Sequence, residues 1–238
     1  MKHYEPYFYS TRDRDTRHAA SAILDAVLPL LPRVLSVADV GCGVGVWLSV
    51  LREKGVETLQ GFDGFWVEDG QLEIPVEMLK RVDLERPITW PIRYDLAISL
   101  EVAEHLLPER AAGFVEDLTK ASDYVLFSAA IPRQGGYHHV NERWQSFWAG
   151  LFAGFGYSPV DCVRPRFWND DSIPCWYAQN MLLYVKDGAP LKTPPVCPMP
   201  LDVVHPAAYL GKVNHPDFRY GLSLAKRAFL HKYFGKSF

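Results

Sequence analysis

The chain lacks several features that would place it in common protein classes. Its four cysteines form no CxxC pair, which argues against a disulfide framework and a zinc cluster. It has no run of about 18 apolar residues, so the sequence predicts no transmembrane segment. The first ten residues, MKHYEPYFYS, do not combine a charged stub with an apolar run, so no secretion signal is predicted. From these absences we expect a cytoplasmic protein.

A large excess of charge of one sign is also missing. The 238 residues include 25 Lys and Arg against 28 Asp and Glu, which gives a formal net charge of −3. This balance does not predict a protein held on nucleic acid by its overall charge, and nucleic acid is not the expected partner. The hydrophobic fraction of 48% is sufficient for one sizeable core.

Hydrophobic periodicity predicts an alternation of strands and helices. Short apolar runs typical of buried parallel strands alternate with segments whose apolar residues recur at helical spacing. The predicted helices cover residues 14–31, 46–54, a segment beginning at Pro108, and 141–155. The predicted strands cover residues 34–40, 58–63, 94–100, 123–129, 160–167 and 180–185, the last two as a hairpin joined by a loop. This order predicts a doubly wound α/β sheet.

A glycine-rich loop follows the first predicted strand. Gly41, Gly43 and Gly45 form the pattern G-x-G-x-G, where a nucleotide-like ligand needs a close approach of the backbone. The pattern is neither the G-x-G-x-x-G of dinucleotide enzymes nor a phosphate loop, so a pyrophosphate ligand is disfavoured. Asp63, 22 residues after Gly41 at the end of the second predicted strand, is placed to accept hydrogen bonds from both hydroxyls of a ribose.

The segments VADVGCGVG (37–45), GFD (61–63) and YDLAISLEVAEH (94–105) resemble the class I S-adenosylmethionine-dependent methyltransferases. The resemblance covers roughly residues 35–186. It implies a Rossmann-like fold, with a mainly parallel seven-stranded sheet and helices on both faces. It also implies S-adenosylmethionine as the cofactor, with its methionine part at the glycine loop, its ribose at the acid of the second strand, and its adenine after residue 82.

The cofactor-binding residues implied by the resemblance are Asp39, Gly41, Cys42, Gly43, Gly45, Asp63, Asp83, Leu84 and Leu100. Only its position between strands supports Asp83, and an exposed loop acid before Pro87 is the alternative. We expect an N-terminal lid helix region over residues 1–33, the S-adenosylmethionine-binding domain over 34–186, and a C-terminal extension over 187–238.

A cluster of acids and histidines follows the next predicted strands. Glu101, Glu104 and His105 come directly after the strand 94–100, and helical geometry beginning there would put Glu101 on the same face as the other two. The loop 132–142 contains two adjacent glycines and presents His138 and His139. Because the carboxyl ends of parallel strands meet at one edge, both segments are expected to lie over the cofactor.

Two chemistries suit this cluster, with Glu104, His105 and His139 as the expected catalytic residues. In one, His139 is a general base that takes a proton from an acceptor hydroxyl. In the other, Glu101, Glu104, His105 and His139 bind a divalent metal such as Mg²⁺, which orients and acidifies the hydroxyl. A purely structural histidine is the third interpretation.

In the metal interpretation, the stretch from Glu101 to His105 resembles the ExxEH site of small-RNA 2′-O-methyltransferases and of some ubiquinone-pathway O-methyltransferases. Metal-independent relatives share a similar stretch. Similar bacterial enzymes, which methylate small molecules or glycans, carry GG-x-x-H-V-N-E in the loop. That pattern aligns their histidine with His139 and leaves His138 as a departure.

Aromatic residues after the predicted catalytic strands indicate where an acceptor would bind. Trp168, Trp176 and Tyr177 flank a polar segment and, with His138, are the candidate substrate contacts, as in a site for a sugar or another polyol. Hydrophobic packing of a hairpin is the alternative. Trp144 and Trp148 lie on the apolar stripe of a predicted helix, so we expect them in the core.

The C-terminal residues 215–238 contain five basic residues against one acid, a side-chain balance of +4. Their apolar residues fit an amphipathic helix. Such a helix could contact an anionic membrane surface or attract a phosphate-bearing substrate, and a docked or dimer-forming helix is the plainer interpretation.

The expected function is methyl transfer to a hydroxyl of a small metabolite or a sugar-containing substrate. After the strand 123–129 the chain reads Ala-Ala-Ile-Pro-Arg where amino-methylating enzymes of adenine bases carry an NPPY-like tetrad, so that class is disfavoured. The alternatives are a metal-dependent RNA-terminal 2′-O-methyltransferase and a cofactor-binding module without catalysis.

Overall fold

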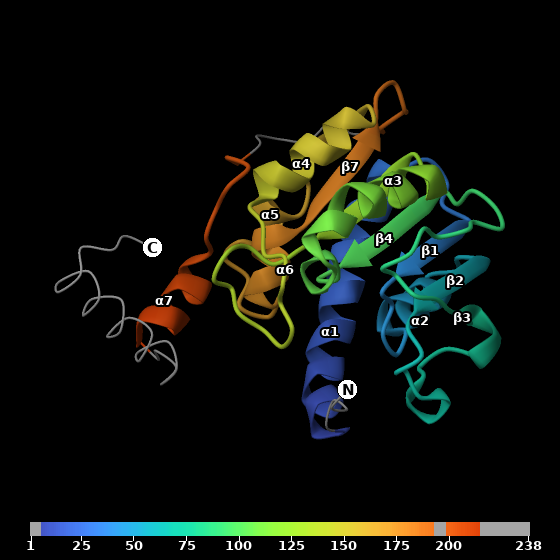
Figure 1. Cartoon of the computed structure of the whole chain (residues 1–238), viewed down its shortest axis with the longest axis horizontal. Helices are drawn as coiled ribbons and strands as arrows, with labels where there is room; N and C mark the ends of the chain where they lie inside the picture. Colours follow the sequence, from blue (N-terminus) through green and yellow to red (C-terminus); the bar gives the residue numbers. More distant parts are fainter. Residues whose placement is uncertain (1–5, 193–198, 215–238) are drawn as a thin grey trace. The chain divides into compact units, whose positions relative to one another are not determined.

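The computed structural model describes residues 6–192 and 199–214, with side chains over 15–192 and 199–211. At its centre is a seven-stranded sheet in the order β3-β2-β1-β4-β5-β7-β6 (Figure 1). The strands are β1 (Ser36–Val40), β2 (Thr58–Asp63), β3 (Leu79–Arg81), β4 (Leu96–Leu100), β5 (Tyr124–Ser128), β6 (Tyr157–Val160) and β7 (Leu182–Lys186). Neighbouring strands from β3 to β5 are parallel, whereas β7 is antiparallel to both β5 and β6. The expected mainly parallel, Rossmann-like sheet is therefore confirmed.

Helices cover both faces of this sheet. The α-helices are α1 (Pro6–Val27), α2 (Val46–Glu53), α3 (Ala111–Ala121), α4 (Gln145–Gly154), α5 (Arg164–Phe167), α6 (Cys175–Asn180) and α7 (Pro206–Asn214). The 3-10 helices are η1 (Leu28–Leu30), η2 (Asp69–Gln71), η3 (Val76–Met78), η4 (Ala103–His105) and η5 (Pro108–Arg110). Figure 1 shows helices on both faces of the sheet. Because strand side chains alternate, Leu96 and Ile98 belong to the core cluster with residues of α1, α2 and α6, while Ala97 belongs to the cluster with residues of α3 and α4.

The predicted strand over 160–167 is wrong. The strand β6 ends at Val160, and α5 begins at Arg164. The guanidinium of Arg164 is fully buried, donates to Asp161 Oδ2 at 2.7 Å, and also donates to the carbonyls of Pro200 and Leu201. Burial without these partners would be costly, so this ion pair and the chain at 199–203 hold a turn where apolar periodicity predicts a strand.

The structure differs from the sequence predictions in several short elements and at helix starts. Strand β3 and helix α6 were not predicted, the former because it has only three residues and the latter because it was assigned to a hairpin loop. Trp148 is buried as expected, but Trp144 is 41% exposed because it precedes α4 as its N-cap residue. Glu101 has a φ of 55° and Ala103–His105 form a single 3-10 turn, so the predicted helix beginning at Glu101 is absent.

Residues 1–203 and 204–238 form two compact units. In the second unit the structure describes α7 alone, and the predicted amphipathic helix over 215–238 lies outside the described residues. No helix among residues 6–192 and 199–214 is both long and apolar enough to cross a membrane. The three-region division, the cytoplasmic location, dimerisation and membrane-surface contact stay predictions.

Candidate functional site

The glycine loop between β1 and α2 has a backbone that only glycine tolerates. Gly41 and Gly45 have φ values of 78° and 88°, in the left-handed region. A Cβ at Gly41 would overlap the side chain of Val102, and one at Gly45 would lie 2.7 Å from Ile74 Cγ1. The amide of Gly41 also donates to the carbonyl of Phe62 at 2.7 Å, which fixes the loop to β2. The loop thus keeps bare backbone at the carboxyl edge of the sheet, as a ligand in close contact requires.

Asp63, at the end of β2, is held by this loop. Its Oδ2 accepts the amide of Gly43 at 2.6 Å and its Oδ1 accepts the amide of Gly64 at 2.6 Å. Burial raises the pKa of the Asp63 carboxyl, and the two amide donors oppose that shift. Each carboxylate oxygen retains lone pairs after one hydrogen bond, so Asp63 still has the acceptor capacity that a ribose diol needs.

Asp39, near the end of β1, has an incompletely satisfied carboxylate. The residue is buried, and its Oδ2 has no hydrogen-bond partner among the described residues. Burial, and then the charge of Asp63, raises the pKa of Asp39 to about 8. A buried carboxylate of this kind is stabilised by a cationic ligand, so the position fits the α-amino group of the expected cofactor.

The other expected cofactor contacts differ in their surroundings. The Cys42 thiol packs where a Cβ of Gly61 would lie, and burial raises its pKa well above the usual range. Leu84 is buried and Leu100 is partly buried, whereas Asp83 is exposed and accepts the amide of Glu85 at 3.1 Å. The exposed position of Asp83 matches its alternative interpretation as a loop acid.

A buried ion pair holds the segment that carries Leu84. Arg110 pairs with Asp117, donates to the carbonyl of Leu84 at 2.9 Å and donates to that of Arg86 at 2.9 Å. Asp117 in turn accepts the amide of Ile88 at 3.0 Å. These contacts hold the loop that carries Leu84, one of the residues expected to contact the cofactor.

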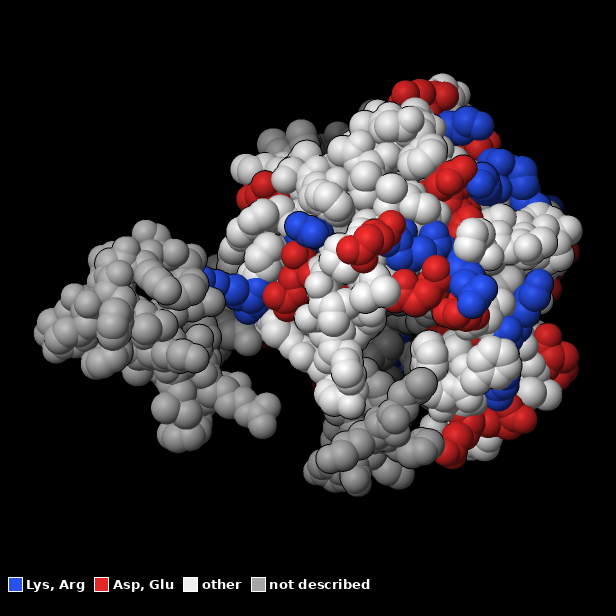
Figure 2. Space-filling view, in the orientation of Figure 1, with Lys and Arg blue, Asp and Glu red and all other residues white. Residues whose placement is uncertain are grey.

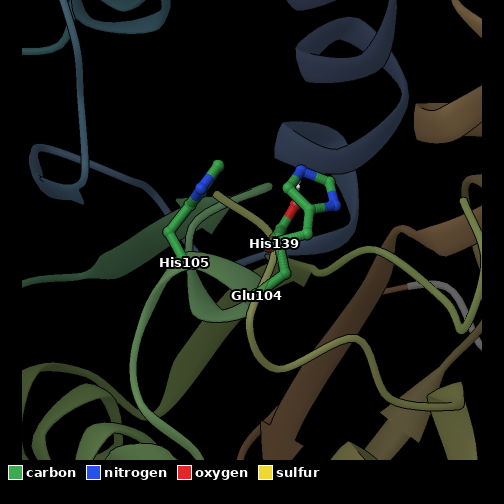
Figure 3. Close-up of side chains that lie close together, drawn as sticks. All are labelled: Glu104, His105 and His139. Atoms are coloured by element: carbon green, nitrogen blue, oxygen red, sulfur yellow. Dashed lines mark ion pairs between the residues drawn. The ribbon is translucent and has the colours of Figure 1, made fainter. Parts of the chain in front are cut away.

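Glu104, His105 and His139 come together at the carboxyl edge of β4 and β5 (Figure 3). One possible ligand atom from each side chain lies within 4.8 Å of the other two. Within the described part of the chain, these three residues form the one group of His, Cys, Asp or Glu side chains close enough to share a metal ion. The Nε2 atom of His139 lies 4.0 Å from Oε1 of Glu104. Glu104 is fully buried, and neither of its carboxylate oxygens has a hydrogen-bond partner among the described residues.

Glu142 orients His139, a role that the sequence reasoning missed. Glu142 Oε1 lies 3.1 Å from His139 Nδ1 and accepts the amide of Gly135 at 2.7 Å, while Oε2 accepts the amide of Arg133 at 2.7 Å. A carboxylate beside Nδ1 favours the tautomer that carries its proton on Nδ1, which would leave Nε2, on the side of Glu104, as the acceptor or ligand atom. The signal was the Glu three residues after the histidine, in the quoted H-V-N-E pattern.

The His139 ring occupies the space beside Gly136 that a side chain at this position would need. A Cβ at Gly136 would overlap the ring and lie 2.7 Å from its Cδ2 atom. Since ordinary carbon contacts are about 3.5–4 Å, Gly136→Ala is expected to move the ring by roughly 1 Å. The imidazole signals of His139 in a ¹H–¹⁵N NMR spectrum should therefore shift. Gly150→Ala is the matched control because nothing lies within 4 Å of a Cβ there, and unchanged His139 signals in Gly136→Ala would contradict the prediction.

Glu101 lies beside this group but outside it. Its carboxylate accepts hydrogen bonds from the side-chain amides of Gln134 and Asn180, at 2.8 and 3.1 Å. Of the four residues expected to bind a metal, the structure thus groups Glu104, His105 and His139 and gives Glu101 separate partners.

The candidate substrate residues differ in burial and in their neighbours. Tyr177 is buried with its ring edge-on to Trp47 at 5.7 Å, whereas Trp168 and Trp176 are partly buried. His138 is exposed, has a φ of 55° and contacts the Tyr137 ring edge-on at 4.3 Å. A cavity of 570 Å³ is lined by Asp15, His18, Asp171, Ser172, Pro174 and Trp176.

Comparisons with known proteins agree with this architecture. A family model described as a methyltransferase domain matches residues 12–161. Magnesium protoporphyrin IX methyltransferase (ChlM) from Synechocystis PCC 6803 with bound SAH is 19% identical, with a TM-score of 0.53 over 74% of this chain and 84% of that one. Streptomyces venezuelae DesVI is 14% identical, with a TM-score of 0.57 over 76% and 95%. The methyltransferase domain of bacterial CtHen1-C is 21% identical, with a TM-score of 0.52 over 73% and 98%. No curated protein matches the sequence.

Proposed function

The chain belongs to the methyltransferase-domain family whose model matches residues 12–161, and on this premise we propose that it transfers the methyl group of S-adenosylmethionine to a hydroxyl oxygen. Similar structures were solved with S-adenosylhomocysteine (SAH) or S-adenosylmethionine (SAM) bound. The support within this chain is the glycine loop, the carboxylate of Asp63, and the buried carboxylate of Asp39, whose Oδ2 has no hydrogen-bond partner among the described residues. These features fit a ligand that carries a ribose and a cationic amino group.

We further propose that Glu104, His105 and His139 bind a divalent cation, of which Mg²⁺ is one candidate. The observation that carries this proposal is the Glu104 carboxylate, which is fully buried, has no hydrogen-bond partner for either oxygen in the part of the chain that the structure describes, and faces Nε2 of His139. A bound cation would polarise the acceptor hydroxyl and ease loss of its proton. Imidazole donors also suit transition metals, so Mn²⁺ is a suitable probe.

His139 acting as a general base without a metal is the competing mechanism. Its Nε2 atom, with Nδ1 on Glu142, has the orientation needed to take a proton from an acceptor hydroxyl. In both mechanisms the chain mainly places the hydroxyl in line with the methyl group, because the sulfonium is already electrophilic.

The cavity beside α1 supports a small hydroxylated acceptor. Helix α6 contributes to both places. Trp176 lines the cavity, and Asn180, at the end of the same helix, donates a hydrogen bond to Glu101 beside the group of Glu104, His105 and His139. Among the described residues its lining has two carboxylates and no Lys or Arg, a balance that favours neutral or cationic acceptors over phosphate-bearing ones. Trp176 offers a flat apolar surface of the kind on which a sugar ring packs.

RNA is a poorer fit than a small acceptor. On the face in Figure 2, basic and acidic side chains of the described residues are intermixed, and no broad basic groove crosses them. RNA lying on this face would find few of the phosphate contacts that supply most of the affinity for nucleic acid. We therefore propose a small metabolite or a sugar-containing molecule as the acceptor.

The test is a methyl-transfer assay with labelled S-adenosylmethionine. Its acceptors are neutral glycosides, aminoglycosides, sugar phosphates and a short RNA duplex, each with Mn²⁺, with Mg²⁺ and with EDTA. We expect transfer to an uncharged or cationic hydroxylated acceptor that EDTA abolishes and added metal restores. Activity that survives EDTA would overturn the metal proposal in favour of His139 as base, and transfer to RNA alone would overturn the acceptor class. Tight SAH binding without transfer to any acceptor would favour a non-catalytic module.

A further inference from the structure

Glu101 occupies the centre of a set of buried side-chain amides. Gln134 Nε2 donates to Glu101 Oε2 at 2.8 Å, and Asn180 Nδ2 donates to Glu101 Oε1 at 3.1 Å. The Glu101 amide also donates to the Ser128 carbonyl at 3.0 Å and lies 3.2 Å from Ser128 Oγ. Both oxygens of the carboxylate therefore have protein donors already.

The amides also bind one another. Gln134 Oε1 accepts from Asn180 Nδ2 at 2.9 Å, from Gln179 Nε2 at 3.1 Å and from the amide of Ile131 at 3.3 Å. Gln179 Nε2 donates to Asn180 Oδ1 at 2.8 Å, and both residues are buried. We call Glu101, Gln134, Gln179 and Asn180 the amide cage.

The amide cage joins three segments that are far apart in the sequence. Glu101 follows β4, Gln134 lies in the loop after β5, and Asn180 ends α6. Glu101 adopts a φ of 55°, a conformation that a non-glycine residue keeps only when its surroundings hold it there. Two residues beyond Gln134 is Gly136, against which the His139 ring packs.

We propose that Glu101 is a positioning residue, which anchors the loop carrying His139 through the amide cage, and that it does not bind the cation. This inference rests on the proposed function for the cation at Glu104, His105 and His139, but the anchoring itself does not depend on it. Glu101 gives the cage its only carboxylate, and the donors on Gln134 and Asn180 require an acceptor at that place.

A carboxylate exchange within the cage separates an anchor from a ligand. In Glu101→Gln one acceptor oxygen becomes an NH₂ group, which faces the N–H donor of either Gln134 or Asn180, so the cage loses complementarity. Adding Gln134→Glu restores it, because position 134 already faces three N–H donors and the amide at position 101 can supply a fourth. The double variant keeps the net charge of the cage but moves the carboxylate to another position.

The experiment compares Glu101→Gln, Glu101→Gln/Gln134→Glu and the unaltered full chain. The measurements are hydrogen–deuterium exchange over residues 131–142, Mn²⁺ affinity by calorimetry, SAH affinity and the melting temperature. We expect Glu101→Gln to speed exchange in the loop and weaken Mn²⁺ binding by about 10- to 100-fold, with both restored in the double variant. Should Glu101→Gln fail to fold, recovery of folding in the double variant would also support the anchor.

Two results would overturn the inference. Slow loop exchange in the double variant together with lost Mn²⁺ binding would show that Glu101 is a ligand of the cation. Unchanged loop exchange in Glu101→Gln would show that it is no anchor. If the unaltered chain binds no Mn²⁺, the cation proposal fails, and the exchange and melting measurements still decide whether Glu101 anchors the loop.

Discussion

Replacing Glu104 with glutamine is expected to reduce methyl transfer by about 10²- to 10⁴-fold, the range in which a group acting on the reacting proton contributes. The substitution preserves the volume of a fully buried side chain but removes the carboxyl group that faces Nε2 of His139 and whose ionised form would bind the cation. Mn²⁺ binding should be lost, because a neutral amide oxygen is a much weaker ligand than a carboxylate. SAH affinity should stay nearly unchanged, since the proposed cofactor contacts lie on the glycine loop, Asp39 and Asp63.

The assay should measure turnover, Mn²⁺ binding and SAH binding on the same preparations. Glu109→Gln is the matched control, because Glu109 is exposed in the next turn, η5, and loses the same charge. Equal activity of the Glu104→Gln and Glu109→Gln variants would contradict the assignment of Glu104. A parallel loss of SAH affinity would instead assign Glu104 to the cofactor side of the site.

The sheet was predictable because its signals are local. A β-branched run before Gly41, a helix after Gly45 and Asp63 at the next strand end occur within short stretches of sequence, and parallel order follows from the alternation. The errors occur where contacts between distant residues decide the structure. The turn after β6 is held by the Arg164–Asp161 pair and by carbonyls near residue 200, which no local pattern can reveal.

The candidate site shows the same division. Its acids and histidines could be found because Glu101, Glu104 and His105 come just after β4 and His139 lies in the loop after β5, and parallel strands bring these ends together. Their partners could not, since Glu101 is joined to Gln134 across 33 positions and to Asn180 across 79. Glu142 is the exception: it lies three residues from His139, and a carboxylate at that spacing was a signal that could have been used.

Replacing Asp39 with asparagine is expected to weaken SAH binding by about 10- to 100-fold and, at the same time, to stabilise the ligand-free protein at pH 8. The binding loss follows because a charge-assisted bond to an ammonium group contributes about 1.5–3 kcal/mol. The stability gain follows from burial, which raises the pKa of Asp39 from an ordinary value of 3.8 to about 8. At 1.36 kcal/mol per unit of pKa, removing the buried charge stabilises the chain by roughly 2–5 kcal/mol.

The sign of this effect depends on pH. The folded state binds the Asp39 proton more tightly than the unfolded state, so the stabilising contribution is complete below about pH 4 and is lost as the pH rises toward 8. Denaturant unfolding of the ligand-free chain should therefore give a larger advantage to Asp39→Asn at pH 8 than at pH 5. Asp25→Asn, which alters an exposed carboxylate on α1, is the control.

The same titration controls cofactor binding in the opposite sense. Because the ammonium group of SAH needs the ionised carboxylate, its affinity for the unaltered chain should fall as the pH drops from 8 to 6, by up to about tenfold per pH unit. Calorimetry at pH 7 in two buffers of different ionisation enthalpy should detect release of a proton on binding. The Asp39→Asn variant should release none and show a flat affinity profile over this range. Identical pH slopes in the two proteins would refute a direct contact between Asp39 and the amino group, and would leave Asp39 as a buried acid whose cost has another origin.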